Sequence, residues 1–256
     1  MGAALKNLAK AWALPLVLIA AWQIASMQGT TMAYAFVPLK DIWTSTVELM
    51  RGGELPLHLA ASIGTALIGL VTGSVAGIAL GTCMALDRRV DLLVSPVYHA
   101  LRQVPTMGLI PIIALWFGTG ELSIRLLVAI ATFEVMALNT YEGLKGVEQR
   151  YRELGRVLTL PRTTTLVRIL FPAAFPSILT GLLQAASFAW IATIGAELLF
   201  TVGPGLGVIM ERAQLMARMD QVIVCLILIG AMGYATNRLC VYIGRRALRW
   251  HQPQSK

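Results

Sequence analysis

The segment ELGRVLTLPRTTTLVRILFP, residues Glu153–Pro172, stands out because it is charged while its neighbours are almost purely apolar. It holds four charged side chains, three consecutive threonines and two prolines, Pro161 and Pro172. The rest of the chain repeats one arrangement, in which long apolar runs are joined by short charged connections. This arrangement is typical of a protein that crosses a membrane several times.

The composition supports a membrane protein. The chain has 256 residues, of which 57% are hydrophobic and only 13% are charged, and its mean hydropathy is +0.70. A soluble domain carries roughly 25% charged residues, so this chain has too few to cover a surface that faces water. The net charge of +8 would suggest nucleic-acid binding in a soluble protein. In a membrane protein it is explained by the lysines and arginines that collect in cytoplasmic loops.

Six runs of the chain approach the length of about 20 apolar residues that a transmembrane helix needs. They lie at about 12–27, 59–86, 92–117, 123–141, 172–199 and 221–243. The third run contains RQVPTMGLIP, where Pro105 and Pro111 each remove a backbone donor and clash with the preceding turn. We therefore predict an all-α bundle of about six transmembrane helices, with the third kinked or broken.

Two further patterns concern packing rather than chemistry. In the second predicted span, glycines recur at every fourth residue and lie on one helix face, where another backbone can approach closely; they are Gly69, Gly73, Gly77 and Gly81. The three cysteines lie in apolar runs, and neither they nor the three histidines have metal-ligand spacing. We interpret both patterns as core packing and expect this chain to bind no metal or cofactor.

The N-terminal segment, residues 1–54, is expected to form a first transmembrane helix and an external loop with a short interfacial helix. Its start resembles a signal peptide, because two lysines precede an apolar run. No charged residue occurs from Ala11 to Leu39, which favours a retained helix over a cleaved one. Cleavage remains the alternative. The transmembrane domain is placed at 55–246, and a basic cytoplasmic tail at 247–256.

The distribution of basic residues predicts the orientation. With a cytoplasmic N-terminus, the cytoplasmic segments hold 14 of the 21 lysines and arginines, and the opposite side holds four. The positive-inside rule therefore places both termini and residues 142–171 in the cytoplasm. The 14 are Lys6, Lys10, Arg88, Arg89, Lys145, Arg150, Arg152, Arg156, Arg162, Arg168, Arg245, Arg246, Arg249 and Lys256; the four are Lys40, Arg51, Arg212 and Arg218.

Residues 142–171 are expected to form an ordered hairpin. Apolar residues recur at steps of three and four, which predicts one stripe of an amphipathic helix that rests on the bundle; they are Leu144, Val147, Tyr151, Leu154 and Leu158. Pro161 should end this helix and open a second one through RTTTLVRIL. The alternative is a solvated loop with ordinary positive-inside charge. An ordered, charged hairpin would suggest a docking surface for a soluble partner.

The hairpin resembles the "EAA" coupling loop of ABC-importer permeases. That pattern reads Glu-Ala-Ala, then Gly after a short gap, then about nine residues and Ile-x-Leu-Pro. Glu153 matches the Glu, Leu154 and Gly155 stand at the Ala positions, and Thr159 stands at the Gly position, while ILFP ends at Pro172 with the expected spacing. The segments LRQVPTMGLIPIIALWFGTGE, NTYEGLKGV, LFPAAFPSILTGL and IGAELL resemble permeases for nitrate, taurine and aliphatic sulfonates.

This resemblance implies the membrane-spanning subunit of a binding-protein-dependent importer in the bacterial inner membrane, paired with a second permease copy. A separate ABC subunit would use ATP and Mg²⁺, since the chain has no GxxxxGK[ST] phosphate loop. A periplasmic or lipid-anchored solute-binding protein would deliver the solute. GPGLG, at Gly203–Gly207, is interpreted as a turn, because no strand is expected before it.

The resemblance assigns ATPase coupling to residues of the hairpin, namely Glu153, Leu154, Gly155, Arg156, Thr159, Pro161 and Pro172. One of them departs from the pattern. A glycine suits a left-handed turn residue, whereas a β-branched threonine does so poorly. We therefore predict that Pro161 shifts or reshapes the turn, so that Thr159 does not adopt a positive φ.

Three charges inside the predicted spans are candidates for the translocation pathway. A charge at the membrane centre costs about 2.5–3.5 kcal/mol on insertion scales and therefore usually faces the bundle interior. Arg102 lies beside the prolines of the third span as a candidate anion contact, and Glu197 lies near the outer end of the fifth. Glu134 stands where related sequences tend to show proline, which suggests a solute with a cationic group. A structural ion pair, a snorkelling side chain or an interfacial position is the alternative for each.

The favoured function is an ATP-driven permease for a small solute, most simply an anion such as a sulfonate, taurine or nitrate. Small heterocyclic compounds are also compatible, and the sequence does not distinguish a homodimer from a heterodimer. An ion-gradient-driven secondary transporter is the main rival, because the broken third span and Glu134 would suit it. A membrane scaffold without transport activity is a third hypothesis. Dependence of uptake on ATP would distinguish the first from the second.

Overall fold

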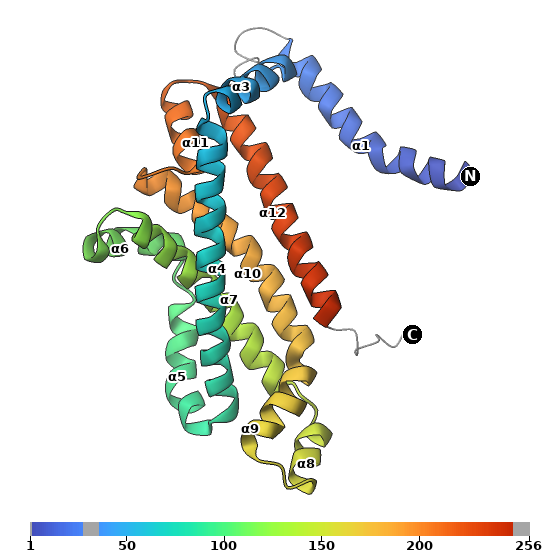
Figure 1. Ribbon diagram of the computed structural model, residues 1–256, viewed down its shortest axis with the longest axis vertical. Coiled ribbons are helices and arrows are strands. Elements are labelled where there is room, and N and C mark those ends of the chain that lie inside the picture. The colour runs from blue at the N-terminus through green and yellow to red at the C-terminus, as the bar shows by residue number, and fades with distance from the viewer. Residues whose placement is uncertain (1, 28–35, 248–256) are drawn as a thin grey trace.

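The computed structural model describes residues 2–27 and 36–247, and the described part is a bundle of helices without strands (Figure 1). Residues 248–256 of the predicted tail lie outside it. The α-helices are α1 (Gly2–Ser26), α3 (Leu39–Arg51), α4 (Glu54–Leu86), α5 (Arg88–Leu101), α6 (Ile110–Phe117), α7 (Glu121–Lys145), α8 (Gln149–Val157), α9 (Arg162–Thr165), α10 (Phe171–Phe200), α11 (Leu206–Leu215) and α12 (Met219–Ala247). A 3₁₀ turn, η1 (Thr106–Leu109), precedes α6, and a π-helical turn, η2 (Leu166–Leu170), joins α9 to α10.

Three continuous helices are long and apolar enough to cross a membrane. They are Glu54–Leu86, Arg162–Phe200 and Met219–Gly244, and the bent pair Arg88–Leu101 with Thr106–Phe117 would make a fourth span. The remaining two predicted spans also correspond to helices. One is α7, which is 25 residues long and carries charges, and the other is the shorter apolar helix Ala13–Ser26. The all-helical membrane fold is therefore confirmed.

The core of the bundle is the contact between α4 and α7, and the four glycines of α4 explain it. A Cβ at Gly69 would lie 2.4 Å from Val128 Cγ1, and one at Gly73 would lie 2.2 Å from the Ala129 carbonyl oxygen. Gly77 and Gly81 meet α7 in the same way. The Thr132 hydroxyl donates to the Gly69 carbonyl oxygen at 2.9 Å. The predicted close helix–helix contact is confirmed, because no other residue type would let the two backbones approach so closely.

The third predicted span is broken, as its prolines indicate. Helix α5 and the segment that begins with η1 meet at an angle of 88°. Pro105 stands at the start of η1 and Pro111 lies in the first turn of α6, where a proline needs no helical donor. Figure 1 shows α6 turning sideways out of the bundle, whereas α5 runs along it. The sequence DRRVD, Asp87–Asp91, predicts a short charged turn, but the turn is shorter than this because α5 already begins at Arg88.

Helices α3 and α11 close the end of the bundle opposite to α8 and α9 (Figure 1). The predicted interfacial helix is α3, which buries Ile42, Ser45 and Leu49. Its Glu48 pairs with Arg218 at 2.9 Å, and Arg218 also pairs with Asp220 at 2.8 Å. Hydrogen bonds to Asp220 and Glu48 raise the pKa of Arg218 above its already high ordinary value. The guanidinium is therefore a permanent charge that ties α3 to the start of α12.

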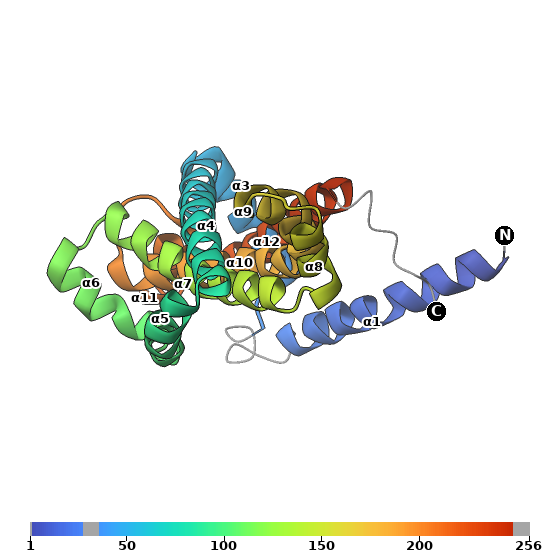
Figure 2. The ribbon, with the colours of Figure 1, turned by 90° about the horizontal axis from the view of Figure 1, so that it is seen from below.

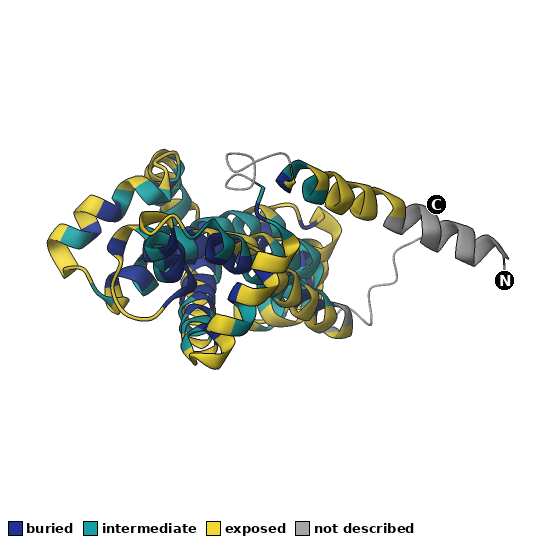
Figure 3. Ribbon diagram, turned by 90° about the horizontal axis from the view of Figure 1, so that it is seen from above, coloured by how far each residue is buried: buried dark blue, intermediate teal, exposed yellow. Residues whose placement is uncertain are grey.

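Burial separates the bundle from its outlying helices. The buried residues gather where α4, α7 and α10 meet, while the described side chains of α1 and α6 are mostly exposed (Figure 3). Viewed from the α8–α9 end, α1 extends away from the bundle (Figure 2). The Trp22 indole donates to the Val37 carbonyl oxygen at 2.8 Å, which fixes the end of α1 near the start of α3.

Candidate functional site

Helix α8, a tight turn and helix α9 form the hairpin that the sequence predicts. The chain reverses after Val157, where the N–H of Thr159 donates to the Arg156 carbonyl oxygen and the N–H of Leu160 donates to the Gly155 carbonyl oxygen, both at 3.0 Å. This pair of bonds is a Schellman motif, which ends a helix through a residue in the left-handed conformation. Thr159 is that residue, with a φ of 49°.

The prediction about Thr159 was therefore wrong. Pro161 does not move the turn, and threonine takes the left-handed conformation for which the family pattern provides a glycine. The two Schellman bonds satisfy carbonyl groups that would otherwise be left free at the helix end, and this compensates for the conformational cost. Pro161 instead stands just before Arg162, the first residue of α9, as expected for a proline that opens a helix.

The predicted amphipathic stripe was also wrong as a single helix. Leu144 lies at the end of α7 and Val147 lies in the turn before α8, and both are buried. Tyr151, Leu154 and Leu158 are exposed instead of resting on the bundle. These residues have helical spacing in the sequence, but the chain bends between Gly146 and Glu148. The first part of the stripe is therefore buried, and the second part is exposed.

The side of α8 that does rest on the bundle is marked by its glycine. Gly155 is buried, and a Cβ at this position would lie 2.6 Å from Cγ2 and 2.9 Å from Oγ1 of Thr165 on α9. The two arms of the hairpin are therefore in van der Waals contact across the turn. The Arg152 guanidinium donates to the Leu144 carbonyl oxygen at 2.7 Å and fixes α8 to the end of α7.

The opposite side of α8 is open. Leu154 is 47% exposed and Val157 is 79% exposed, and Glu153, which directly precedes Leu154, is exposed as well. Among the described residues Glu153 makes no ion pair, while the nearby Arg150 pairs with Glu148 at 2.6 Å. Of the other predicted coupling residues, Arg156, Thr159 and Pro161 are exposed at the turn, and Pro172 lies partly buried at the start of α10. The hairpin thus presents an apolar ridge beside a carboxylate.

Two of the three predicted pathway residues lie together at the break in the third span. Arg102 follows the last residue of α5, and Glu134 lies on the facing part of α7. Among the described residues the two side chains form no ion pair with each other. The Tyr98 hydroxyl donates to the Glu134 backbone carbonyl at 2.5 Å and holds α5 against α7. The break thus carries a positive charge on one side, and the neighbouring helix α7 carries a negative one.

The third predicted pathway residue, Glu197, is enclosed by protein. It is 2% exposed, accepts a hydrogen bond from Ser62 Oγ at 2.7 Å and accepts another from the Gly207 N–H at 2.9 Å. His58 Nδ1 lies 2.9 Å from the Gly205 nitrogen. Only Gly203–Gly205 of the predicted turn lies outside a helix, since α11 begins at Leu206. A Cβ at Gly205 or Gly207 would collide with Glu197, so the segment packs closely against this carboxylate.

Sequence reasoning missed the partners of Glu197 and a polar strip on α10. Ser62 and His58 are single polar residues near the start of a long apolar helix, so they gave no recognisable pattern. The polar strip consists of Thr180, Gln184 and Ser187, which are exposed and lie three to four residues apart. Gln184 accepts a hydrogen bond from Asn139 of α7 at 3.2 Å. The spacing of the strip was visible in the sequence, although its exposure was not.

The comparisons with known proteins agree with one another. Residues 69–249 match the family described as "Binding-protein-dependent transport system inner membrane component". A Bacillus subtilis protein named as an aliphatic sulfonates transport permease, SsuC, is 31% identical over 237 residues, covering 93% of this chain and 86% of the relative. The nitrate import permease protein NrtB of Leptolyngbya laminosa is 27% identical, covering 91% of this chain and 85% of the relative.

Solved structures show the same fold. A subunit in the crystal structure of an amino acid ABC transporter with histidines superimposes with a TM-score of 0.62 at 16% identity, covering 77% of this chain and 97% of that one. A subunit of the MetNI methionine ABC transporter in an inward-facing conformation gives a TM-score of 0.57 at 15% identity, with 73% and 94% covered. At these identities the likeness concerns the fold alone.

Proposed function

The chain belongs to the family of inner membrane components of binding-protein-dependent transport systems, and from this premise we propose how it is driven and what it carries. It is the permease subunit of an ATP-driven importer and is not itself an enzyme, because in this family a separate ATPase subunit hydrolyses ATP. Its partners are that ATPase subunit and a solute-binding protein. The assignment of coupling residues, pathway, solute and orientation below is our proposal.

The observation that carries the coupling proposal is the exposed ridge of the α8–α9 hairpin. Leu154, Val157 and Leu158 expose apolar surface beside Glu153, on a short, rigidly fixed helix and at its C-cap. An exposed apolar patch with a polar rim is typical of a protein contact. The tight turn at Thr159 and the contact between Gly155 and Thr165 make the hairpin stiff. Closure of the ATPase pair against this ridge would therefore move α7 and α10 as rigid bodies.

The orientation follows from the same hairpin. An ATPase that uses cytosolic ATP must meet the permease in the cytoplasm, so we place α8 and α9 there. The α4–α5 turn, with Arg88 and Arg89, lies at the same end of the bundle, and α3 and α11 lie at the other (Figure 1). The positive-inside rule supports this assignment. The N- and C-termini are then cytoplasmic, as the sequence predicts.

A second copy of the chain is proposed to cover the polar strip of α10. Gln184 is the fourteenth residue of a 30-residue helix, so it lies near the middle of the span. A polar side chain at this depth is unfavourable against lipid, and it normally faces another helix or a water-filled cavity. The Thr180 and Ser187 hydroxyls already donate to carbonyl oxygens within α10. Packing of two copies through α10 would therefore mainly shield Gln184 from lipid and enclose a pathway between the copies. A homodimer is the simplest arrangement that provides this.

Arg102 and Glu134 are proposed to line that pathway at the break in the third span. Irregular backbone at membrane depth persists where it is covered by protein or borders a cavity. The guanidinium would attract an anionic group and the carboxylate a cationic one, so the pair suits a solute that carries both, such as a taurine-like sulfonate. Glu197 is not included, because its oxygens are occupied by Ser62 and Gly207.

The solute is proposed to be a small anion of the sulfonate, taurine or nitrate type. Relatives named for aliphatic sulfonates and for nitrate support this class, since both are small oxyanions. A bicarbonate transport system permease, CmpB of Synechococcus elongatus, is 28% identical and extends the range to another oxyanion. An amino group on the solute would be favoured by Glu134, whereas a simple oxyanion would need Arg102 alone.

Uptake into proteoliposomes tests this function. The permease is purified with its ATPase, reconstituted, and supplied with the solute-binding protein and labelled taurine, ethanesulfonate or nitrate. We expect uptake of at least one of these solutes when ATP is enclosed in the liposomes on the side of the ATPase. We expect no uptake when a proton or sodium gradient is the only source of energy. Uptake driven by the gradient without ATP would favour the secondary-transporter alternative instead.

A further inference from the structure

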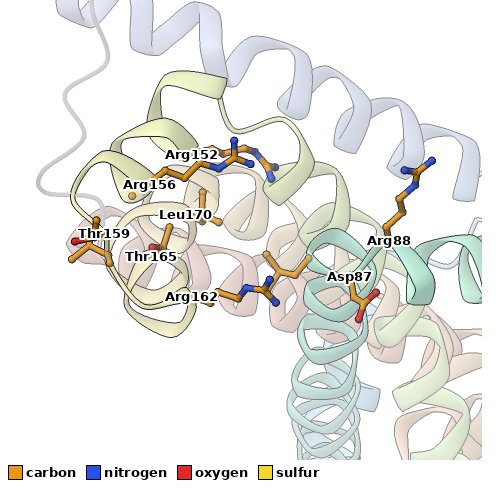
Figure 4. Close-up of a pocket in the computed structure, with 11 residues that line it drawn as sticks. Asp87, Arg88, Arg152, Arg156, Thr159, Arg162, Thr165 and Leu170 are labelled. Atoms are coloured by element: carbon orange, nitrogen blue, oxygen red, sulfur yellow. The ribbon is translucent and has the colours of Figure 1, made fainter.

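A basic cavity lies between the hairpin and the α4–α5 turn. It has a volume of about 840 Å³, and four arginines line it: Arg88, Arg152, Arg156 and Arg162. They come from three separate elements, namely the start of α5, one side of α8 and the start of α9. Figure 4 shows Arg152 and Arg156 together on α8, and Arg162 extending toward the turn that carries Asp87 and Arg88.

The positive charge of this cavity is not balanced by the described residues. Arg88, Arg156 and Arg162 form no ion pair with any of them. The one acidic residue in the lining is Asp87, and its Oδ1 already accepts the Arg89 N–H at 2.7 Å as the cap of α5. Four cations against one carboxylate leave three positive charges around one space. Such an arrangement is stabilised by an anion between the cations.

The helices that begin at the cavity add to its positive potential. Arg88 is the first residue of α5, and Arg162 is the first residue of the 39-residue helical segment Arg162–Phe200. Pro161 precedes that segment and provides no side-chain cap for its first N–H groups. The N-terminus of a helix carries a partial positive charge that favours anions. Both helix starts therefore reinforce the arginines.

The cavity does not include the apolar ridge proposed to bind the ATPase, although Gly155, Arg156 and Thr159 of the proposed coupling set line it. Arg152, Gly155 and Arg156 of α8 and Thr159 of the turn line it, whereas Leu154, Val157 and Leu158 do not. An acidic surface of the ATPase could still approach the arginines, but the concave shape between two elements of one chain suits a small group better. Planar guanidinium groups bind phosphate oxygens in pairs.

We propose that this cavity binds a phosphate group, from an anionic lipid head group or from a phosphate compound in solution. The proposal rests on the proposed function only for placing the cavity at the cytoplasmic surface, where anionic lipids and phosphate compounds both occur. An occupied site would tie the hairpin to the α4–α5 turn through the anion. The ligand would then stiffen the element that transmits motion between the ATPase and the spans.

Matched variants of the complete permease–ATPase complex test this site. Arg88→Gln with Arg162→Gln removes two cations of the cavity and no proposed coupling residue. The control, Arg89→Gln with Arg168→Gln, removes two cations from the same end of the bundle and outside the cavity lining. The thermal midpoint in detergent is followed against inorganic phosphate, at an ionic strength kept constant with chloride. Complexes in phosphatidylcholine nanodiscs, with and without phosphatidylglycerol, form the second arm.

For a site that takes a dissolved phosphate compound, inorganic phosphate raises the midpoint of the wild type and of the control. The apparent affinity of the cavity variant for inorganic phosphate is about tenfold or more lower than that of the wild type, because two charge-assisted bonds are lost. For a lipid site, phosphatidylglycerol is retained by the wild type and the control and is lost from the cavity variant, while inorganic phosphate has no effect. Equal responses of the cavity variant and the control in both arms would overturn the proposal. Loss of the ATPase from the cavity variant, without any phosphate or lipid effect in the wild type, would instead assign the arginines to the protein contact and would also overturn it.

Discussion

The Thr165 side chain occupies the space that a side chain on Gly155 would need. The Cγ2 atom of Thr165 lies 2.6 Å from the Cβ position of Gly155, and Oγ1 lies 2.9 Å from it. Helices α8 and α9 thus meet at a glycine on one arm and a β-branched residue on the other. The family pattern has alanine at the position of Gly155. In this chain the glycine at this position leaves room for the larger side chain of Thr165 on α9.

The first prediction concerns this contact. Gly155→Ala should lower the thermal midpoint of the purified protein and weaken ATP-coupled uptake, because overpacking costs about 1–3 kcal/mol. Thr165→Ala removes both of the closest atoms. The double variant should therefore recover most of the loss, with a coupling energy of about 1 kcal/mol or more in the double-mutant cycle. Strict additivity of the two changes would show that the contact does not exist.

The second prediction concerns the turn. Thr159→Gly should raise the midpoint by about 1–3 °C, because a left-handed residue other than glycine costs roughly 1–2 kcal/mol and part of this is offset by the flexibility of glycine in the unfolded chain. Thr163→Gly is the control, since Thr163 lies in the right-handed helix α9. That change should give no increase. A lower midpoint for Thr159→Gly would contradict the left-handed turn.

The third prediction concerns the α4–α7 core. Gly73→Ala should lower the midpoint by several degrees or prevent insertion, because its Cβ would lie 2.2 Å from the Ala129 carbonyl oxygen, a backbone atom that a rotamer change cannot move. Gly64→Ala lies on the same helix with nothing within 4 Å of the added atom. It should be tolerated. Equal effects of the two variants would argue against the close approach of these helices.

The fourth prediction separates two roles of Glu197. Removal of the carboxylate in Glu197→Ala leaves the Gly207 N–H and the Ser62 hydroxyl without their acceptor, at a cost of about 1–3 kcal/mol for each buried group. We expect faster proteolysis of the segment Gly203–Gly207, with the KM for the transported solute unchanged in reconstituted uptake. A changed KM or solute preference, together with normal resistance to proteolysis, would place Glu197 in the pathway instead.

Much of the fold was predictable, because apolar length, proline and glycine spacing act locally. The runs of apolar residues located the helices, Pro105 and Pro111 located the break, and the glycines of α4 located a close helix contact. The stripe from Leu144 to Leu158 misled, because periodicity does not register a bend. Gly146, next to the apolar Val147, was the only local sign that one helix ends and another begins.

The site was predictable in position but not in detail. Chemical preference alone argued against a left-handed Thr159, and the two Schellman bonds that stabilise it connect backbone groups whose geometry the sequence does not reveal. Glu197 was recognised as an unusual charge, yet its partner Ser62 lies 135 residues away in the chain. The polar strip of α10 needed knowledge of which face of the helix is left uncovered.

The most direct test of the central claim is whether the hairpin holds the ATPase. The tagged permease is purified in mild detergent as wild type, as Glu153→Arg, and as Asp41→Arg, which reverses a charge on α3 at the other end of the bundle. We predict that the ATPase subunit co-purifies with the wild type and with Asp41→Arg and is lost from Glu153→Arg, while all three permeases keep the same thermal midpoint. Retention of the ATPase by Glu153→Arg, at the level of the wild type, would contradict the assignment of the hairpin as the coupling surface.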